Sequence, residues 1–490
     1  MRETSNIDKH SKVDQTTIQK STITRKMKND IGKHPKASQT TMIDLTPEVA
    51  NLLGKGIGTY MQKHYGKRIA VGHDNRLTSE NLHAAFIKGL MSTGCNVTSI
   101  NLATSPLLYY TVCKYDFDGG INITASHNPK EYNGFKIVGR KGHSICGEEI
   151  QTIRVLIDEK KFARGQGSLE HKNIFDDYMA DMKKKIQPVK PLKIVIDAGN
   201  GTAGAFAPKL FRSFGHEIIP LYCELDGNFP NHPANPEEHE NMIDLIKMVK
   251  KTKADLGIGF DGDGDRIGMV DEKGQFYAAD FLLILLSRDL LSRNKGAKIV
   301  YDLKSSQVLE KDIYKNGGVP IMAKTGHSFI EQTMKREEAL LGGEVSGHMF
   351  FGENYYGFDD AFLAGLKLAE ILSKSILKSG KKLSEQFQGL PKTCITPEIK
   401  APCGDAEKCN VVEKIKTHFE RDHKCITIDG VRVDFGDNAW GIVRCSNTSP
   451  YLTLRFEAKN TKKLNEIQKK VFDALKIFPE VDNSWYPVIL

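Results

Sequence analysis

The sequence lacks a hydrophobic stretch long enough to cross a bilayer. Its longest purely apolar run covers only residues 281–286, whereas a membrane-spanning helix needs about 20 apolar residues. The sequence also lacks a C-x-x-C motif, and its nine cysteines are odd in number. This pattern argues against a disulfide framework and against a thiolate zinc site. We therefore expect a cytoplasmic protein with no membrane partner.

Residues 1–42 contain no aromatic side chain. They hold eleven Ser/Thr, nine Lys/Arg and four Asp/Glu, a composition that predicts disorder. A transit peptide is the alternative, but two Arg and four acids fit one poorly. The segment carries about +5 of the net charge of +8, so the rest of the chain is nearly balanced. Binding to nucleic acid is therefore not predicted.

Three segments of the chain repeat one plan. Residues 68–100, 193–221 and 298–324 each read as a short strand, a polar loop, a helix closed by Gly, and a second strand. Such units pack as mainly parallel sheets with helices on both faces, and ligands gather at the carboxyl ends of the strands. The repeat predicts three similar α/β domains with mainly parallel sheets.

The last hundred residues follow another pattern. Strand-like stretches joined by tight turns are flanked by expected helices near 406–420 and 460–475. We expect a C-terminal α+β domain with an antiparallel sheet. The expected domain limits are 43–171, 172–275, 276–390 and 391–490.

The first candidate site loop is TASHNPKEYNGFK, residues 124–136. It follows a predicted strand and is broken by Asn128-Pro129, so Ser126 stands in a tight turn. An exposed Ser in this position could act as a nucleophile, although the loop lacks the G-x-S-x-G elbow of acyl hydrolases. A Ser-capped turn without chemistry is the alternative interpretation.

The second loop, DGDGDR, places Asp261, Asp263 and Asp265 at alternate positions. It resembles a calcium-binding EF-hand loop, but Arg266 stands where that loop needs Gly, and the flanking residues read as strands rather than helices. Three carboxylates around one point suit Mg²⁺ that is shared with a phosphate. Arg266 then points at the phosphate. A run of solvated surface acids is the alternative.

Two further loops carry groups suited to sugar and phosphate. In GGEVSGHMF, residues 342–350, Glu344, Ser346 and His348 alternate, so on an extended segment they would share one face. His327 lies just upstream, and both histidines could transfer protons or simply form structural hydrogen bonds. In RCSNTSP, residues 444–450, the Arg, the hydroxyls and the turn could cradle a phosphate. A plain hairpin turn is the alternative for this last loop.

These loops in this order resemble the α-D-phosphohexomutase family, in its phosphomannomutase/phosphoglucomutase branch. The resemblance covers about residues 43–490 and also rests on DGNFPNHPANPE (226–237), YYGFDDA (355–361) and LRFEA. It implies interconversion of hexose 1-phosphate and 6-phosphate, with mannose or glucose as the sugar. The implied route runs through a phosphoserine and a hexose 1,6-bisphosphate, which also serves as activator. The implied partners are small hexose phosphates, and a monomer is expected, with a dimer as the alternative.

The resemblance also implies a role for each site residue. Ser126, as phosphoserine, would complete a site for one Mg²⁺ with Asp261, Asp263 and Asp265. Lys136 and Arg266 would assist the transfer. The expected catalytic and substrate-binding residues further comprise Lys304, His327, Glu344, Ser346, His348, Arg444, Ser446, Asn447 and Thr448.

The sequence departs from the family near its start. An Arg-x-Tyr-Asp-Ile-Arg-Gly type stretch normally precedes the first helix, and only KNDIGK, residues 28–33, resembles it. Either Arg25, Lys28 or Lys33 substitutes for the missing Arg, or the enzyme is slower than its relatives. Residues 25–36 could hold a degenerate first strand.

Three other functions remain open from the sequence. They are a phosphoglucosamine mutase, a metal-dependent sugar phosphatase that uses the same Ser, and a calcium- or nucleic-acid-binding protein based on the Asp loop and the basic start.

Overall fold

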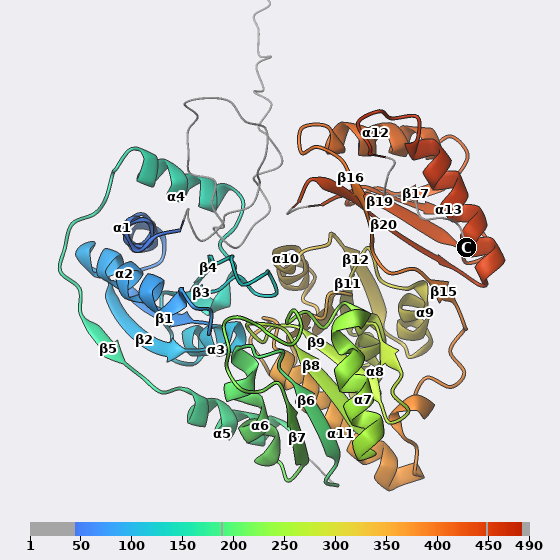
Figure 1. Cartoon of the computed structure of the whole chain (residues 1–490), viewed down its shortest axis with the longest axis horizontal. Helices are drawn as coiled ribbons and strands as arrows, with labels where there is room; N and C mark the ends of the chain where they lie inside the picture. Colours follow the sequence, from blue (N-terminus) through green and yellow to red (C-terminus); the bar gives the residue numbers. More distant parts are fainter. Residues whose placement is uncertain (1–44, 188–189, 447–448, 483–490) are drawn as a thin grey trace, which may run out of the picture.

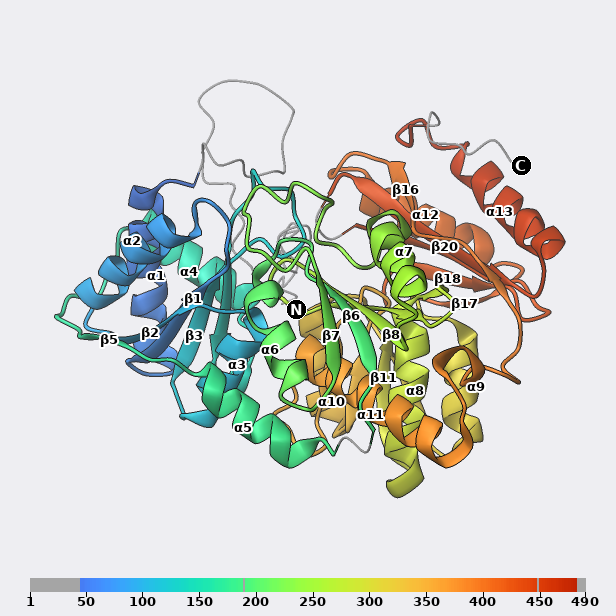
Figure 2. The ribbon, with the colours of Figure 1, turned by 60° about the horizontal axis from the view of Figure 1, so that its bottom comes forward.

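The computed structural model describes residues 45–187, 190–446 and 449–482. The disorder predicted for residues 1–42, and the degenerate strand at 25–36, lie outside the described residues. Four sheets follow one another along the chain, with the first and the last at opposite ends of the molecule (Figure 1). Figure 2 shows the same order after rotation. Among the helices of the described ranges, none is long and apolar enough to cross a membrane.

The first sheet has the order β4-β3-β1-β2-β5, and only β4 runs antiparallel to its neighbour. The strands are β1 Arg68–His73, β2 Asn96–Leu102, β3 Gly119–Ile123, β4 Phe135–Gly139 and β5 Leu169–His171. The helices are α1 Pro47–His64, α2 Ser79–Ser92, α3 Ser105–Lys114 and α4 Glu148–Asp158, with a 3₁₀ turn at Arg140–Gly142. Helix α1 begins where the Thr46 side chain accepts a hydrogen bond from the Val49 N–H and Pro47 fills the first turn.

The second sheet has the order β10-β9-β8-β6-β7, with β8, β9 and β10 antiparallel to one another in turn. Its strands are β6 Lys193–Asp197, β7 Glu217–Leu221, β8 Leu256–Phe260, β9 Ile267–Asp271 and β10 Phe276–Tyr277. Its helices are α5 Phe175–Lys185, α6 Ala207–Arg212 and α7 Ile243–Thr252, with 3₁₀ turns at Thr202–Ala205 and His239–Met242. Every residue of β8 is buried, as expected for a central strand covered on both faces.

The third sheet has the order β12-β11-β13-β14, and β14 is its antiparallel member. Its strands are β11 Lys298–Asp302, β12 Val319–Ala323, β13 Leu341–Gly343 and β14 Met349–Phe351. Its helices are α8 Ala279–Arg293, α9 Gln307–Lys315, α10 His327–Glu337 and α11 Ala361–Ser379, followed by a 3₁₀ turn at Leu383–Glu385.

The three sheets share one topology. Each contains a first strand flanked by the second and the third, and a fourth strand pairs antiparallel with the third. The predicted strand–helix–strand repeats are β1–α2–β2, β6–α6–β7 and β11–α9–β12, so the prediction of three similar α/β domains is confirmed.

The C-terminal part forms an antiparallel sheet of order β15-β20-β19-β18-β17, in which β16 also pairs with β20. Its strands are β15 Cys394–Ile395, β16 Ile399–Pro402, β17 Lys424–Ile426, β18 Val431–Asp434, β19 Trp440–Cys445 and β20 Tyr451–Ala458. Helices α12 Lys408–Phe419 and α13 Thr461–Leu475 cover the sheet. The expected α+β fold of this part is therefore confirmed.

The buried hydrophobic residues form a large cluster shared by the three α/β parts and a separate cluster in the C-terminal part. One cluster runs through all three α/β parts, from Leu107 of α3 through Phe260 of β8 to Leu372 of α11. The C-terminal sheet packs on α12 and α13 in a cluster of its own. It meets the third sheet through a small cluster of Leu303, Trp440 and Ile442. The three α/β parts are thus one packed body, to which the C-terminal part is attached.

Candidate active site

Three loops in equivalent positions meet at the candidate site. In each α/β part the loop between the third and fourth strands carries candidate residues: Ser126 between β3 and β4, the three Asp between β8 and β9, and Glu344 to His348 between β13 and β14. Backbone pairing joins the second and third loops, since Arg266 bridges His348 and the Ile267 N–H donates to the Gly347 carbonyl at 3.2 Å. The shared topology therefore brings residues far apart in sequence to one point.

Ser126 occupies a constrained turn. Its φ of +54° lies in the left-handed region, and its N–H donates to Thr124 Oγ1 at 2.9 Å. The Ser126 Oγ donates to Asp261 Oδ2 at 2.7 Å. His127 lies beside it, with Nδ1 3.3 Å from Oγ, and burial holds the pKa of this imidazole well below its usual value. The hydroxyl thus faces the acidic loop rather than capping a turn.

Arg76 forms hydrogen bonds with the backbone of the Ser126 loop. Its guanidinium donates to the carbonyls of Ser126 and Asn128 at 2.6 Å each and to that of Pro129 at 2.7 Å, and it pairs with Asp74 at 3.1 Å. The sequence analysis did not single out Arg76. Its position just after the first strand of the repeat could have identified it, because ligands and site residues gather at the ends of such strands.

The acidic loop forms a compact group of carboxylates. Asp261, Asp263 and Asp265 are fully buried, and each offers an oxygen within 4.8 Å of those of the other two. Asp261 Oδ1 accepts the N–H groups of Asp265 and Arg266 at 3.0 and 3.1 Å. Strands β8 and β9 flank the loop, so it is not an EF-hand. The interpretation as solvated surface acids is excluded by the burial.

The charges of this group are only partly balanced. Lys136 of β4 pairs with Asp263 at 2.6 Å and with Asp265. Burial raises the pKa of the Asp263 carboxyl, but the Lys136 ammonium outweighs it and leaves that pKa below its usual range. Burial and the two neighbouring carboxylates raise the pKa of Asp261. Asp263 Oδ1 and Asp265 Oδ1 are buried without a hydrogen-bond partner among the described residues. Carboxylate oxygens are ligands that hard divalent cations prefer, and here their negative charge is only partly balanced. The group therefore suits a divalent cation.

Gly262 lets the first and second loops touch. A Cβ at this position would lie 2.4 Å from the Ser126 carbonyl oxygen. Gly264 adopts a φ of +71°, and a Cβ there would meet Thr104 at 2.8 Å. Glycine at these two positions allows the close backbone approach that brings Ser126 to the carboxylates.

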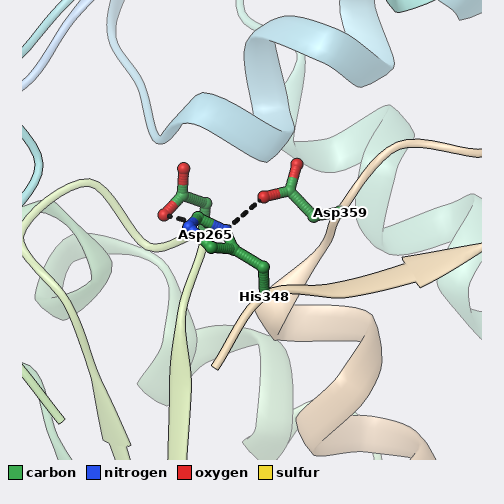
Figure 3. Close-up of side chains that lie close together, drawn as sticks. All are labelled: Asp265, His348 and Asp359. Carbon is green, nitrogen blue, oxygen red and sulfur yellow. Dashed lines mark hydrogen bonds and ion pairs between the residues drawn. The ribbon is translucent and has the colours of Figure 1, made fainter. Parts of the chain in front are cut away.

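A hydrogen-bonded chain links Arg266 to two histidines. Arg266 Nε donates to His348 Nε2 at 3.0 Å, and His348 Nδ1 lies 2.6 Å from Asp359 Oδ2. His327 Nε2 contacts the other oxygen of Asp359 at 2.8 Å. Figure 3 shows His348 between Asp359 and Asp265, with the Asp265 contact at 3.6 Å. Burial lowers the pKa of His327, but Asp359 more than compensates and raises it to about 9.

Asp359 was not identified as a site residue in the sequence. It appears only within the YYGFDDA stretch, and its partners lie on the third loop and on α10. The two histidines were identified, and the structure places them side by side with ring centroids 5.4 Å apart.

Glu344 and Ser346 lie in a tight turn rather than on a strand. Strand β13 ends at Gly343 and β14 begins at Met349, and the Glu344 N–H donates to the His348 carbonyl at 2.9 Å. Ser346 Oγ donates to Glu344 Oε2 at 3.4 Å, and the Gly326 N–H donates to Oε1 at 2.5 Å. Burial raises the pKa of Glu344. The two oxygen-bearing side chains are therefore adjacent, as the alternation suggested, but the hairpin turn places them.

Lys304 and Arg444, which are expected to bind phosphate, pair with acidic side chains that the sequence analysis did not identify. Lys304 pairs with Glu398 at 2.9 Å and Glu237 at 3.7 Å, and Arg444 Nε donates to Asp429 at 2.9 Å. Arg444 Nη2 is buried without an acceptor in the described ranges. Ser446 is the first residue after β19, and its side chain is buried. Asn447 and Thr448 lie outside the described residues.

Models of one protein family match the chain in four consecutive pieces. The phosphoglucomutase/phosphomannomutase alpha/beta/alpha domains I, II and III match residues 28–164, 176–274 and 278–394. The C-terminal domain of the same family matches residues 398–474.

Individual relatives agree with these matches. A phosphomannomutase/phosphoglucomutase of Pseudomonas aeruginosa is 42% identical over 90% of this chain and 93% of its own length. A phosphoglucomutase of Neisseria gonorrhoeae is 41% identical over 87% of the chain and 92% of its own.

A solved structure agrees as well. It is a phosphoglucomutase/phosphomannomutase family protein from Burkholderia thailandensis, and it superposes with a TM-score of 0.83 at 36% identity, covering 90% of this chain and 95% of that one. The resemblance seen in the sequence is therefore confirmed: the chain belongs to the phosphoglucomutase/phosphomannomutase family.

Proposed function

We propose that the protein is a phosphohexomutase, an isomerase that interconverts the 1-phosphate and 6-phosphate of mannose, glucose or both. One observation carries the proposal most directly. The Ser126 hydroxyl lies 2.7 Å from a carboxylate of a buried acidic group, and two oxygens of that group have no hydrogen-bond partner among the described residues. A nucleophile beside a site suited to a divalent cation is the arrangement that phosphoryl transfer needs.

The acidic loop would hold one Mg²⁺. Asp261, Asp263 and Asp265 would be its protein ligands, together with a phosphoryl oxygen on Ser126. The ion would supply positive charge to the transferring phosphoryl group. Lys136 lies beside the same carboxylates, and Arg266 directly follows them in the loop. Both cations can stabilise the same charge, since preorganised donors in a buried site act strongly on charge that develops during transfer.

Ser126 would alternate between two forms. As phosphoserine it donates its phosphoryl group to the free hydroxyl of a hexose phosphate, so the P–O bond to Ser126 breaks and a P–O bond to the sugar forms. The product is a hexose 1,6-bisphosphate, which turns over in the site. Its other phosphoryl group then returns to Ser126. Added bisphosphate activates the enzyme by the same reaction, because it phosphorylates a free Ser126.

His348 is our candidate for the group that accepts the proton of the attacking hydroxyl. Its Nε2 accepts a hydrogen bond from Arg266, so Nδ1 carries the proton that binds Asp359. When Arg266 turns to the phosphoryl group, Nε2 is free to take a proton. His327, whose pKa is raised to about 9, stays protonated at neutral pH. It pairs with Asp359 and so helps to hold the carboxylate that contacts His348.

The substrate would be held at both ends. Glu344 and Ser346 offer oxygens for the sugar hydroxyls. Arg444, with a free Nη2 donor, and Lys304 would bind the phosphate that is not being transferred, together with Ser446, Asn447 and Thr448. The same set must accept either phosphate, so recognition relies on phosphate and on hydroxyls presented alike in both orientations.

The proposal includes the domain limits 43–171, 172–275, 276–390 and 391–490. It also places the enzyme in the cytoplasm as a monomer. The cytoplasmic assignment is supported by the nine cysteines, which are all free thiols.

The test is a substrate panel combined with intact-mass measurement. Purified protein is given mannose, glucose and glucosamine 1-phosphates with Mg²⁺ and glucose 1,6-bisphosphate, and isomer formation and inorganic phosphate are both followed. We expect turnover of the first two and a mass increase that maps to Ser126. Faster turnover of glucosamine phosphate would change the substrate assignment, and phosphate release that outpaces isomerisation would make the protein a phosphatase.

A further inference from the structure

Two cysteines touch beside the candidate phosphate-binding loop. The Cys445 thiol donates to the Cys409 sulfur across 3.1 Å, and the two residues are 36 positions apart in sequence. Cys409 lies in the first turn of α12, and Cys445 is the last residue of β19. Both are partly accessible to solvent. Within the described ranges no other two cysteines share a hydrogen bond.

The surroundings tie this pair to the loop. Lys408, next to Cys409, is buried and donates to the carbonyls of Ser446 at 2.7 Å and Ser449 at 3.1 Å. Arg444 and Ser446 flank Cys445 on either side in the sequence. Helix α12 packs against β19 in the C-terminal part (Figure 1). A change in the separation of the two sulfurs would therefore move the first turn of α12 relative to the residues proposed to hold phosphate.

We propose that Cys409 and Cys445 form a reversible disulfide that controls phosphate binding by Arg444 and Ser446. The oxidant is a peroxide. It converts the Cys409 thiol to a sulfenic acid with release of one water, and the Cys445 thiol then displaces the hydroxyl with release of a second water. The two thiols are oxidised, the peroxide is reduced, and an external thiol restores both cysteines.

The order of these steps follows from the hydrogen bond. Cys445 is the donor, and burial together with the neighbouring thiol raises its pKa, so it stays protonated. Cys409 is then the sulfur that meets the oxidant, and Cys445 resolves the product. Bond formation shortens the separation of the sulfurs from 3.1 Å to about 2.05 Å. That movement is small enough for one helix turn and one strand end to accommodate.

The functional effect rests on the proposed mutase activity. Arg444 and Ser446 move with Cys445, whereas Ser126 and the acidic loop belong to other sheets. Oxidation should therefore raise the KM for hexose phosphate several-fold and change kcat less. The regulated property is substrate capture, not the chemistry at Ser126.

The test uses the reduced full-length chain treated with increasing hydrogen peroxide. The expected result is a loss of two hydrogens in the intact mass and a non-reduced peptide that links residues 409 and 445, both reversed by dithiothreitol. Cys409→Ser and Cys445→Ser should each abolish the linked peptide. Cys425→Ser is the matched control, because Cys425 is a half-buried thiol of the same sheet, and it should retain the link.

Steady-state kinetics then show whether the disulfide changes the KM for hexose phosphate. Peroxide should raise the KM of the wild type and of Cys425→Ser, and leave that of Cys409→Ser unchanged. Absence of the linked peptide, or an equal KM change in Cys409→Ser, overturns the inference. If the linked peptide forms in a protein without mutase activity, the proposed function fails while the disulfide stands, so the two failures are distinguished.

Discussion

The loop between the third and fourth strands differs in kind among the three α/β parts, although its backbone position is the same. The first carries a hydroxyl in a left-handed turn. The second carries three buried carboxylates. The third carries a carboxylate, a hydroxyl and an imidazole in a hairpin turn. One repeated scaffold thus presents the side chains proposed as nucleophile, metal ligands and sugar ligands at a single point.

The shared topology sets where the three loops meet, and their side chains set which groups are presented there. The three α/β parts share one hydrophobic cluster, which holds their loops in fixed relation. The fourth loop belongs to a sheet with a separate core. It is attached through the small cluster of Leu303, Trp440 and Ile442 and through hydrogen bonds, in which Arg432 donates to the Leu303 and Ser305 carbonyls at 2.6 and 3.0 Å. We therefore expect the residues proposed to bind phosphate to change position more easily than the three loops of the α/β parts.

The largest effect should come from the first loop. Ser126→Ala removes the only oxygen proposed to carry the phosphoryl group, so mutase turnover should fall by at least about 10³-fold. Coupled-enzyme assays and intact mass would measure the loss of turnover and of phosphoserine. Ser292→Ala, at an exposed helical serine, should behave as wild type. Wild-type rates in Ser126→Ala with added glucose 1,6-bisphosphate would contradict a covalent mechanism.

The second loop should respond through metal affinity. Asp263→Asn removes one of the three charges while it preserves size, so the Mg²⁺ concentration for half-maximal activity should rise by about 10- to 100-fold. Activity titrated with Mg²⁺ after treatment with a chelator gives this value. Asp176→Asn, an exposed acid paired with Lys209, serves as control. An unchanged Mg²⁺ dependence in Asp263→Asn would show that this loop does not hold the metal.

The third loop should affect sugar recognition. Glu344→Gln replaces an acceptor for sugar hydroxyls with an amide, and a hydrogen bond to a charged group contributes about 1.5–3 kcal/mol. We expect kcat/KM to fall by about 10- to 100-fold for both hexoses, while Mg²⁺ dependence and phosphoserine content stay normal. If kcat/KM is retained, Glu344 does not contact the sugar.

The smallest effect should concern how the first and third parts are joined. His143 lies 3.6 Å from Glu149 and 3.7 Å from Glu331 of α10, and these carboxylates raise its pKa from 6.5 to about 9. A raised pKa in the folded state means that the stabilisation is complete below pH 6.5 and is lost as the pH rises through about 9. His143→Gln should lower the free energy of unfolding at pH 6 by no more than about 1 kcal/mol, because the imidazole is partly exposed, and should lower the melting temperature accordingly.

The difference between His143→Gln and the wild type should disappear near pH 9.5. Thermal unfolding followed across this pH range provides the measurement. His171→Gln, at an exposed histidine, is the control. A difference that is constant with pH would mean that His143 acts by packing and not by charge.

The sequence predicted the repeats and most candidate residues because both signals are local. Strands β1, β6 and β11 are short apolar runs that end in polar loops, and the DGDGDR spacing identifies its three acids without reference to anything distant. Asp359 and Arg76 were missed because their roles depend on partners brought by tertiary folding. The turn at Glu344 was read as extended because alternation does not distinguish a strand from a hairpin turn.

The contact between Gly262 and the Ser126 carbonyl has a consequence for recombination between relatives. A side chain at position 262 would place its first carbon 2.4 Å from that oxygen, so only glycine fits there while the two backbones keep this spacing. We therefore expect a chimera that joins the first part of one family member to the second part of another to require glycine at this position, whereas the C-terminal part has a core of its own.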